Sequence, residues 1–212
     1  TQDSLIKFVR KNIMKFSSME VQWFGGEPLE ALDVIENLSN AFISICRAAK
    51  RNYTSSMTTN GYNLTLDSLK VYNYQITIDG IKPTHDSQRV LRNGNGTFDK
   101  IVSNLVTIKT NIKSGIPKFT IRTNFTKCIA QYIDEYIDYF SSLFSDDARF
   151  SFSFQKAADW GGNRVQNMSD NLIDNDFFME LLNKISQYKN KLDISPHSAL
   201  MNGKTCVCYA NK

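Results

Sequence analysis

Histidine and cysteine are both scarce in this chain of 212 residues, which contains two histidines and four cysteines. A zinc site or a Ser-His-Asp triad is difficult to build from His85 and His197 alone. Four cysteines are an ordinary number for a protein of a reducing compartment and too few for a disulfide scaffold. We therefore expect a cytoplasmic location and a fold stabilised by a hydrophobic core.

The chain also lacks long apolar runs and a strong excess of one charge. The longest apolar run, Ala41 to Cys46, is far shorter than the roughly 20 residues of a membrane-spanning helix. Lys and Arg number 25 against 21 Asp and Glu, so the net charge is +4, and no long basic run is present. We expect neither a membrane nor a nucleic acid as partner. The 42% of hydrophobic residues can instead supply the core of one large domain.

Short strand-like segments alternate with amphipathic helical segments along the chain. We expect strands at 21–24, 53–59, 74–78, 118–125 and 150–154. We expect helices near 5–16, 35–49, 65–71, 98–112, 129–144 and 175–188, and irregular structure at 81–96. This alternation indicates α/β architecture with a parallel sheet and right-handed crossovers. Because the chain opens on a helix, we also expect a strand upstream of it.

Ligands of parallel α/β folds bind where the strands end, so the loops after the strands form the candidate site. Gly25, Gly26, Glu27 and Pro28 follow the first expected strand. Two glycines would let a ligand approach the backbone closely, and the Glu27 carboxylate would add an acceptor, a combination that suits an ammonium group. A tight strand-to-helix turn would explain the same residues.

The loops after the next two strands are polar and contain glycine. Asn60 and Gly61 follow the second strand, where a plain turn would explain them. Thr77 and Asp79 project to one face of the third strand, so their hydroxyl and carboxylate could bind a diol or simply cap a turn. The later stretch 85–97 resembles a phosphate cradle, but its spacing fits neither a P-loop nor a dinucleotide fingerprint. A surface loop with Thr97 as a helix N-cap explains it.

The four cysteines fall into two groups. Cys46 lies on the buried stripe of an expected helix and Cys128 lies between a strand and a helix, so both are most simply structural. Cys206 and Cys208 lie close together near the end of the chain, in the kind of loop that supplies thiolates to iron–sulfur clusters. Two cysteines are half of a typical cluster shell.

In their order along the chain, these segments resemble the core of radical S-adenosylmethionine (SAM) enzymes, in the branch with a C-terminal SPASM extension. The matching segments are Phe24-Gly25-Gly26-Glu27-Pro28, Thr59-Asn60-Gly61, Ile76-Thr77-Ile78-Asp79-Gly80, His85-Asp86 with Arg89, and Gly94-Asn95-Gly96-Thr97-Phe98. The resemblance implies a partial (β/α)6-type TIM-like barrel with parallel strands that lacks its first strand. Residues 1–200 would form this core, and 201–212 would begin the SPASM-like extension.

The resemblance also implies a role for individual residues. Gly25, Gly26 and Glu27 would bind the SAM amino group, in agreement with the ammonium receptor above. Thr77 would lie near the SAM ribose and Arg122 would approach the SAM carboxylate. Asp79 would organise its loop rather than perform chemistry. Cys208, and with it Cys206, would be ligands of an auxiliary cluster.

One element of the family pattern is absent from the chain. The CxxxCxxC motif, whose thiolates hold the [4Fe–4S] cluster that SAM chelates, does not occur in the sequence. It belongs after the strand that we expect upstream. We therefore interpret the chain as the core of a longer enzyme that cannot by itself hold the SAM-cleaving cluster, and expect the remaining SPASM cysteines beyond its end.

For the intact parent, the resemblance implies reductive cleavage of SAM to a 5′-deoxyadenosyl radical, which abstracts hydrogen from a substrate. It implies a peptide or protein substrate and an electron donor such as flavodoxin or ferredoxin. Sulfatase maturases commonly have Gln before the Gly-Gly-Glu-Pro motif, where this chain has Phe24. The sequence therefore favours another peptide or protein maturation, with anaerobic sulfatase maturation as the alternative.

Two readings from other classes remain open at this point. The chain could be a non-catalytic barrel that binds SAM, a nucleotide or a peptide. It could also be a non-radical barrel enzyme that uses Glu27 and Asp79 as an acid–base pair. The first would lack a cluster motif upstream, and the second would be active without iron, reductant or SAM.

Overall fold

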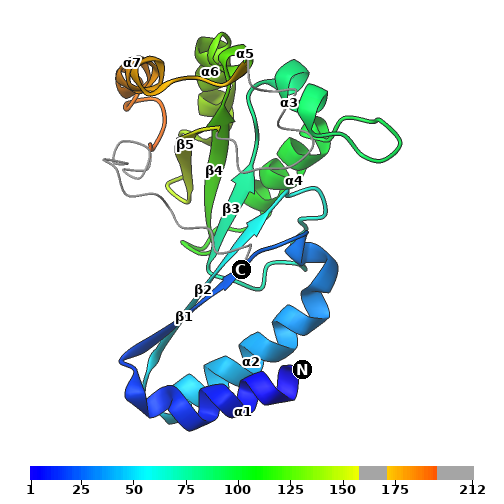
Figure 1. Cartoon of the computed structure of the whole chain (residues 1–212), viewed down its shortest axis with the longest axis vertical. Coiled ribbons are helices and arrows are strands. Elements are labelled where there is room, and N and C mark those ends of the chain that lie inside the picture. Colours follow the sequence, from blue (N-terminus) through cyan, green and yellow to red (C-terminus); the bar gives the residue numbers. More distant parts are fainter. Residues whose placement is uncertain (158–170, 195–212) are drawn as a thin grey trace.

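The computed structural model describes residues 1–157 and 171–194, and its centre is one sheet of five parallel strands (Figure 1). The strands are β1 (Ser18–Trp23), β2 (Asn52–Thr59), β3 (Asn73–Thr77), β4 (Lys118–Phe125) and β5 (Phe150–Lys156). Their order in the sheet is their order in the sequence, and every neighbouring pair is parallel. The predicted α/β class is confirmed, and the sheet is that of a partial TIM-like barrel.

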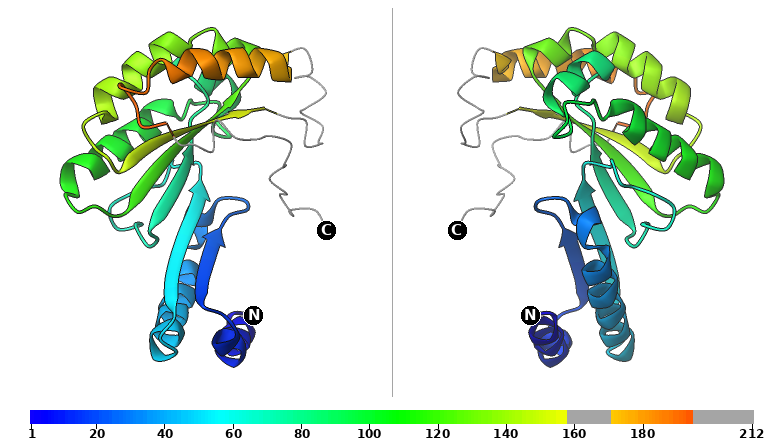
Figure 2. Two further views of the ribbon diagram at one scale, coloured as in Figure 1. Left: turned by 90° about the vertical axis from the view of Figure 1, so that its left-hand side faces the viewer. Right: turned by 90° about the vertical axis from the view of Figure 1, so that its right-hand side faces the viewer.

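Sequential strand order decides where the helices lie. Since right-handed crossovers that always step in one direction stay on one side of a sheet, the helices gather on one face (Figure 2). The longer helices are α1 (Gln2–Asn12), α2 (Leu32–Ala48), α4 (Phe98–Asn111), α6 (Ile133–Phe144) and α7 (Asn175–Ser186). Short helices are η1 (Ile13–Lys15), η2 (Pro28–Ala31), α3 (Lys82–Gln88) and α5 (Lys127–Ala130).

The hydrophobic core fills the space between the sheet and these helices. Strand β5 illustrates the cause, since Phe150, Phe152 and Phe154 point into the core and alternate with Ser151 and Ser153. A period of two puts all three rings on one face, where aromatic rings of α6 contact them. A smaller cluster at the N-terminal end joins Ile13 to Ile45 and Cys46.

The opposite face of the sheet is polar. In register, Thr58, Gln75, Thr120 and Ser151 form one row across β2 to β5. Thr77, Arg122 and Ser153 form the next row toward the carboxyl ends of the strands, and Asn124 and Gln155 form a third. No helix of the described part lies over this face in Figure 2. A surface of hydroxyl, amide and guanidinium groups is suited to contact a polar ligand.

All five strands occur where the sequence predicts them, and the long helices are confirmed as well. The helix predicted at 65–71 is wrong, because that segment consists of turns. Three of its backbone N–H groups bind side chains: Lys70 and Val71 donate to the hydroxyl of Tyr74, and Thr65 donates to Ser68. A backbone whose donors are occupied by side chains does not continue as a helix.

The stretch 81–96, predicted to be irregular, contains α3. Pro83 begins this helix favourably, and Thr84 and His85 are buried on its inner side. Its sequence has too few apolar residues for a helical stripe. Tertiary contacts of polar side chains hold the helix instead.

No helix among residues 1–157 and 171–194 is long and apolar enough to cross a bilayer. The predicted absence of a membrane partner and the cytoplasmic location stay predictions.

Candidate functional site

Two consecutive glycines open the site at the carboxyl end of β1. Gly25 has a φ of +96° and Gly26 a φ of +55°. Residues other than glycine rarely adopt these backbone angles. A Cβ atom at either position would meet nothing within 4 Å. Backbone conformation therefore selects glycine here, and the peptide groups face open space that a ligand could fill.

Glu27 joins this loop to the end of β2. Its Oε1 accepts hydrogen bonds from the Thr59 hydroxyl at 2.5 Å and from the Leu29 backbone at 3.1 Å. Its Oε2 accepts one from the Asn60 backbone at 2.8 Å. The carboxylate thus caps η2 and fixes two neighbouring loops. It retains acceptor capacity for one donor more, since a carboxylate has about four lone-pair positions.

Thr77 and Arg122 are register partners in neighbouring strands, so their side chains share the polar face of the sheet. Both are half-buried. The guanidinium of Arg122 donates from Nε to the Asn124 side chain at 3.1 Å. The structure therefore brings these two predicted site residues together. Three strand positions separate Arg122 on β4 from the glycine loop after β1.

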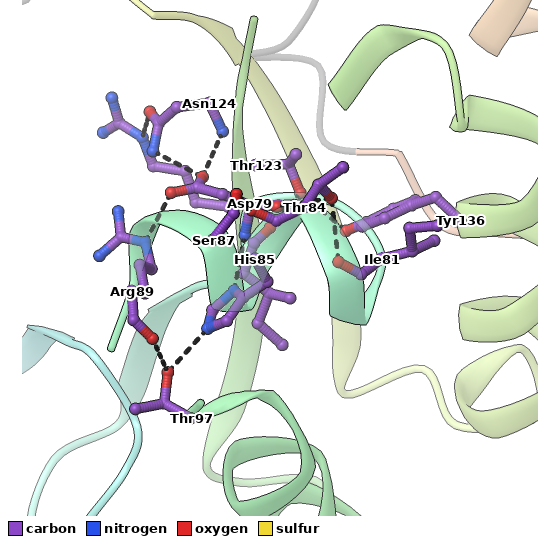
Figure 3. Close-up of polar contacts among 12 residues, drawn as sticks. Asp79, Ile81, Thr84, His85, Ser87, Arg89, Thr97, Thr123, Asn124 and Tyr136 are labelled. Atoms are coloured by element: carbon purple, nitrogen blue, oxygen red, sulfur yellow. Dashed lines mark hydrogen bonds and ion pairs between the residues drawn. The ribbon is translucent and has the colours of Figure 1, made fainter. Parts of the chain in front are cut away.

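Asp79 is 4% exposed and connects three elements (Figure 3). Its Oδ2 accepts from Nε of Arg89, at the end of α3, at 2.6 Å. Its Oδ1 accepts from the backbone and the side-chain amide of Asn124, on β4, at 2.9 and 3.1 Å. These contacts agree with a role of Asp79 in organising its loop. They also put Glu27 and Asp79 against different partners, which does not favour an acid–base pair.

His85 is fully buried beneath this network. Its Nδ1 accepts from the Asp79 backbone N–H at 3.1 Å, and its Nε2 lies 3.0 Å from the Thr97 hydroxyl. That hydroxyl donates to the Arg89 carbonyl, so Nε2 carries the proton and His85 is neutral. Burial, with the nearby Arg89 guanidinium, lowers the pKa of His85 to about 4.

The side chain of Asp86, a residue of α3, caps the N-terminus of helix α4. Its Oδ1 accepts from the backbone N–H groups of Thr97 and Phe98 at 2.8 and 2.9 Å. Thr97 occupies the N-cap position, as predicted, but its own hydroxyl makes no capping bond. Hydrogen bonds among its own polar residues therefore hold the stretch 85–97 together.

Sequence reasoning did not assign Asn124 or give Arg89 a place at the site. Both take part because Asp79 contacts them. Asn124 could have been found from the strand period, since it lies two residues after Arg122 and hence on the same face. Nothing in the local sequence indicates that α3 carries Arg89 to this edge.

The cysteines predicted as cluster ligands, Cys206 and Cys208, lie outside the described residues, as does the whole segment 201–212. Within the described ranges, Cys46 is buried, Cys128 is exposed, and neither is in a disulfide. No group of three or more His, Cys, Asp or Glu side chains in these ranges could hold a metal ion.

Solved structures with the same arrangement exist, although no protein-family model and no curated protein match the sequence. One is native anSMEcpe, an anaerobic sulfatase-maturating enzyme, with bound AdoMet and Cp18Cys peptide. It has a TM-score of 0.71 and 18% identity over 91% of this chain. A second, native anSMEcpe with bound AdoMet and Kp18Cys peptide, has a TM-score of 0.68 at the same identity.

This chain has the anSMEcpe fold. The fold that the sequence resemblance implies is thereby confirmed. The chain spans about 55% of the length of the anSMEcpe chain solved with Cp18Cys peptide. AdoMet and peptide are bound by anSMEcpe itself.

Replacing Gly96 should weaken the start of α4. A Cβ at this position would lie 2.3 Å from the Asp86 carboxylate, which would have to leave the two N–H groups that it caps. We expect Gly96→Ala to lower the free energy of unfolding by about 1–2 kcal/mol, the range for a lost N-cap. Gly115→Ala is the matched control, because its Cβ would meet nothing within 4 Å. Equal urea midpoints for the two variants would contradict this.

The low pKa of His85 predicts loss of stability in mild acid. Below a pH of about 6.5 the unfolded chain binds a proton that the folded His85 resists until its pKa of about 4. The free energy of unfolding should therefore fall as the pH drops through this window, by about 3 kcal/mol in total. Urea titrations at several pH values measure this slope.

Two substitutions assign that slope to one histidine. His85→Gln should be less stable at neutral pH but should lose most of the dependence between pH 6.5 and 4. His197→Gln, which removes the other histidine, should retain the dependence of stability on pH. A slope that survives in His85→Gln would show that His85 is not the responsible group.

Proposed function

We propose that this chain is the SAM-binding core of a radical SAM enzyme that acts on a peptide or protein. The observation that carries the proposal is the open glycine loop after β1, in the fold of anSMEcpe structures that were solved with bound AdoMet. Loops at the carboxyl ends of parallel strands are where such folds bind ligands. This loop is also the segment with the most specific resemblance in the sequence.

The residues present fit the methionyl part of SAM. Gly25 and Gly26 have open space where a side chain would lie, so a ligand could approach their peptide groups, and Glu27 retains acceptor capacity beside them. Carbonyl and carboxylate acceptors together suit a primary ammonium group. Thr77, two strands further along the same edge, offers a hydroxyl for the ribose. These four residues would bind and orient SAM.

The iron–sulfur chemistry needs residues beyond these. A bound [4Fe–4S] cluster would supply the electron for SAM cleavage, and the donor to the cluster would be a protein such as flavodoxin or ferredoxin. The cysteines at 46, 128, 206 and 208 contain no CxxxCxxC spacing. Cys206 and Cys208 would belong to an auxiliary cluster in a SPASM-like segment from 201 onward.

Sulfatase maturation is the second candidate, because the matched solved structures are of anSMEcpe. Phe24, which occupies the position before the two glycines, is 58% exposed. An exposed aromatic ring there offers a stacking surface in place of an amide. We therefore retain a peptide or protein maturation of other chemistry as the main proposal.

Calorimetric titration of the chain with SAM tests the proposal. We expect Gly25→Ala to weaken SAM binding by about tenfold or more, since the substitution disturbs backbone acceptors worth about 1.5–3 kcal/mol. Gly94→Ala is a matched control: Gly94 has a φ of +84° and open space around its Cβ position, so it suffers similar strain away from the site. Its SAM affinity should equal that of the wild type.

Three results would contradict the proposal. They are absence of SAM binding, an equal loss in both glycine variants, and ATP binding as tight as SAM binding, which would favour a nucleotide-binding barrel. After anaerobic reconstitution with iron and sulfide we expect no stoichiometric SAM-cleaving cluster, because the cluster motif is absent from the chain. Formation of such a cluster would contradict the interpretation of the chain as a core alone.

A further inference from the structure

Two arginines are anchored to one buried carboxylate at the carboxyl edge of β3 and β4. Arg89 binds Oδ2 of Asp79 directly, and Arg122 binds the Asn124 side chain, which donates to Oδ1 of the same carboxylate. Asp79 and Asn124 thus form a bridge between the two guanidinium groups. Figure 3 shows Arg89, Asp79 and Asn124 of this arrangement.

Each arginine uses only its Nε atom in this arrangement. Within residues 1–157 and 171–194, no hydrogen bond reaches the terminal nitrogens of either guanidinium group. The Arg89 side chain is 37% exposed, and Arg122 is half-buried on the polar face. Fixed Nε atoms orient both groups, and their terminal N–H groups are free to bind a planar anion in two-point fashion.

The charge of the cluster also favours an anion. Two guanidinium groups face one carboxylate, so the set of Arg89, Arg122 and Asp79 has a net charge of +1. The hydroxyl of Ser153 flanks Arg122 in its row and adds a neutral donor. A carboxylate with oxygens free for hydrogen bonds matches this set.

Distance argues against the SAM carboxylate as that anion. The ammonium and the carboxylate of SAM are attached to the same carbon atom. If Gly25, Gly26 and Glu27 bind the ammonium, the carboxylate lies near β1, whereas Arg122 is on β4. Three strand spacings of about 4.8 Å make about 14 Å along the sheet. A different molecule is therefore the better ligand for the arginines.

We propose that Arg89 and Arg122 together bind an acidic side chain of the peptide substrate and so contribute to substrate choice. This inference rests on the proposed function, which supplies the peptide. Asp79 and Asn124 are positioning residues, because they fix the two guanidinium groups. The substrate class is then a peptide with Asp or Glu near the reacting residue.

Two short probes that differ in one group test the inference. N-acetylated, C-amidated pentapeptides with a single central Glu or Gln are titrated into the full ¹⁵N-labelled chain, and the Asn124 side-chain signals are followed. We expect the Glu probe to bind about tenfold more tightly than the Gln probe, because charge-assisted hydrogen bonds contribute about 1.5–3 kcal/mol. Equal binding of the two probes would overturn the proposal.

Variants assign the effect to the two arginines. Arg122→Gln should abolish the preference for Glu without unfolding the chain, since among residues 1–157 and 171–194 the Arg122 side chain bonds only to Asn124. Arg89→Lys should reduce it, because lysine keeps the charge and loses the two-point geometry. Arg92→Gln removes an exposed arginine of the same stretch and should leave the preference intact. A preference that persists in Arg122→Gln would overturn the proposal.

SAM and methylthioadenosine distinguish the source of the carboxylate. Methylthioadenosine lacks the methionyl ammonium and carboxylate. If SAM, but not methylthioadenosine, shifts the Asn124 signals and displaces the Glu probe, the arginines bind SAM and the substrate assignment is wrong. If SAM shifts the Gly25 and Gly26 amides and leaves the Glu probe bound, both proposals are supported. Failure of SAM to shift those amides counts against the proposed function separately.

Discussion

The buried carboxylate of Asp79 is the interaction on which the candidate site depends. It joins the end of α3 to strand β4 and thereby fixes Arg89 and Asn124. Directly behind it, the Asp79 backbone N–H is accepted by a neutral His85, which in turn reaches Thr97 at the start of α4. A buried carboxylate without its partners would be strongly destabilising, so these elements hold one geometry together. These contacts position Arg89 and Asn124 at the site edge without any ligand.

Sequential strand order explains why this edge is accessible. The helices of residues 1–157 and 171–194 lie on one face, so the apolar alternate residues of each strand enter a core there, and the polar alternate residues lie on the opposite face. Strand β4 shows both faces within a few residues: Phe119 and Ile121 are buried, and Thr120 and Arg122 lie on the other side. The same period of two therefore builds both the core and the polar surface. Glu27, which follows β1, holds the glycine loop against the end of β2 through its bonds to Thr59 and Asn60. Its role is therefore similar to that of Asp79, which holds Arg89 and Asn124.

The strands and long helices could be predicted because their periodicity is strong, as in Phe150, Phe152 and Phe154. The order of the glycine motifs indicated the fold and the position of the site. Helix α3 could not be predicted, since it is polar and depends on the tertiary contacts of His85. Local propensity likewise failed before β3, where the Tyr74 hydroxyl binds two backbone N–H groups of the preceding turn. The strand period places Asn124 on the face of Arg122, but its bond to Asp79 joins residues 45 positions apart in sequence, which no local pattern predicts.

Amide hydrogen exchange in Asp79→Asn tests most directly whether this carboxylate organises the site. The Asn124 backbone N–H donates to Asp79, whereas the Asn60 backbone N–H donates to Glu27 and serves as an internal reference. The substitution removes the negative charge and one of the two acceptor oxygens, so the Asn124 bond loses its charge assistance whichever way the new amide lies. We expect exchange at Asn124 to become faster by about tenfold or more, in keeping with a charged hydrogen bond, and exchange at Asn60 to stay as in the wild type. Unchanged protection of Asn124, or equal loss at both amides, would contradict the account.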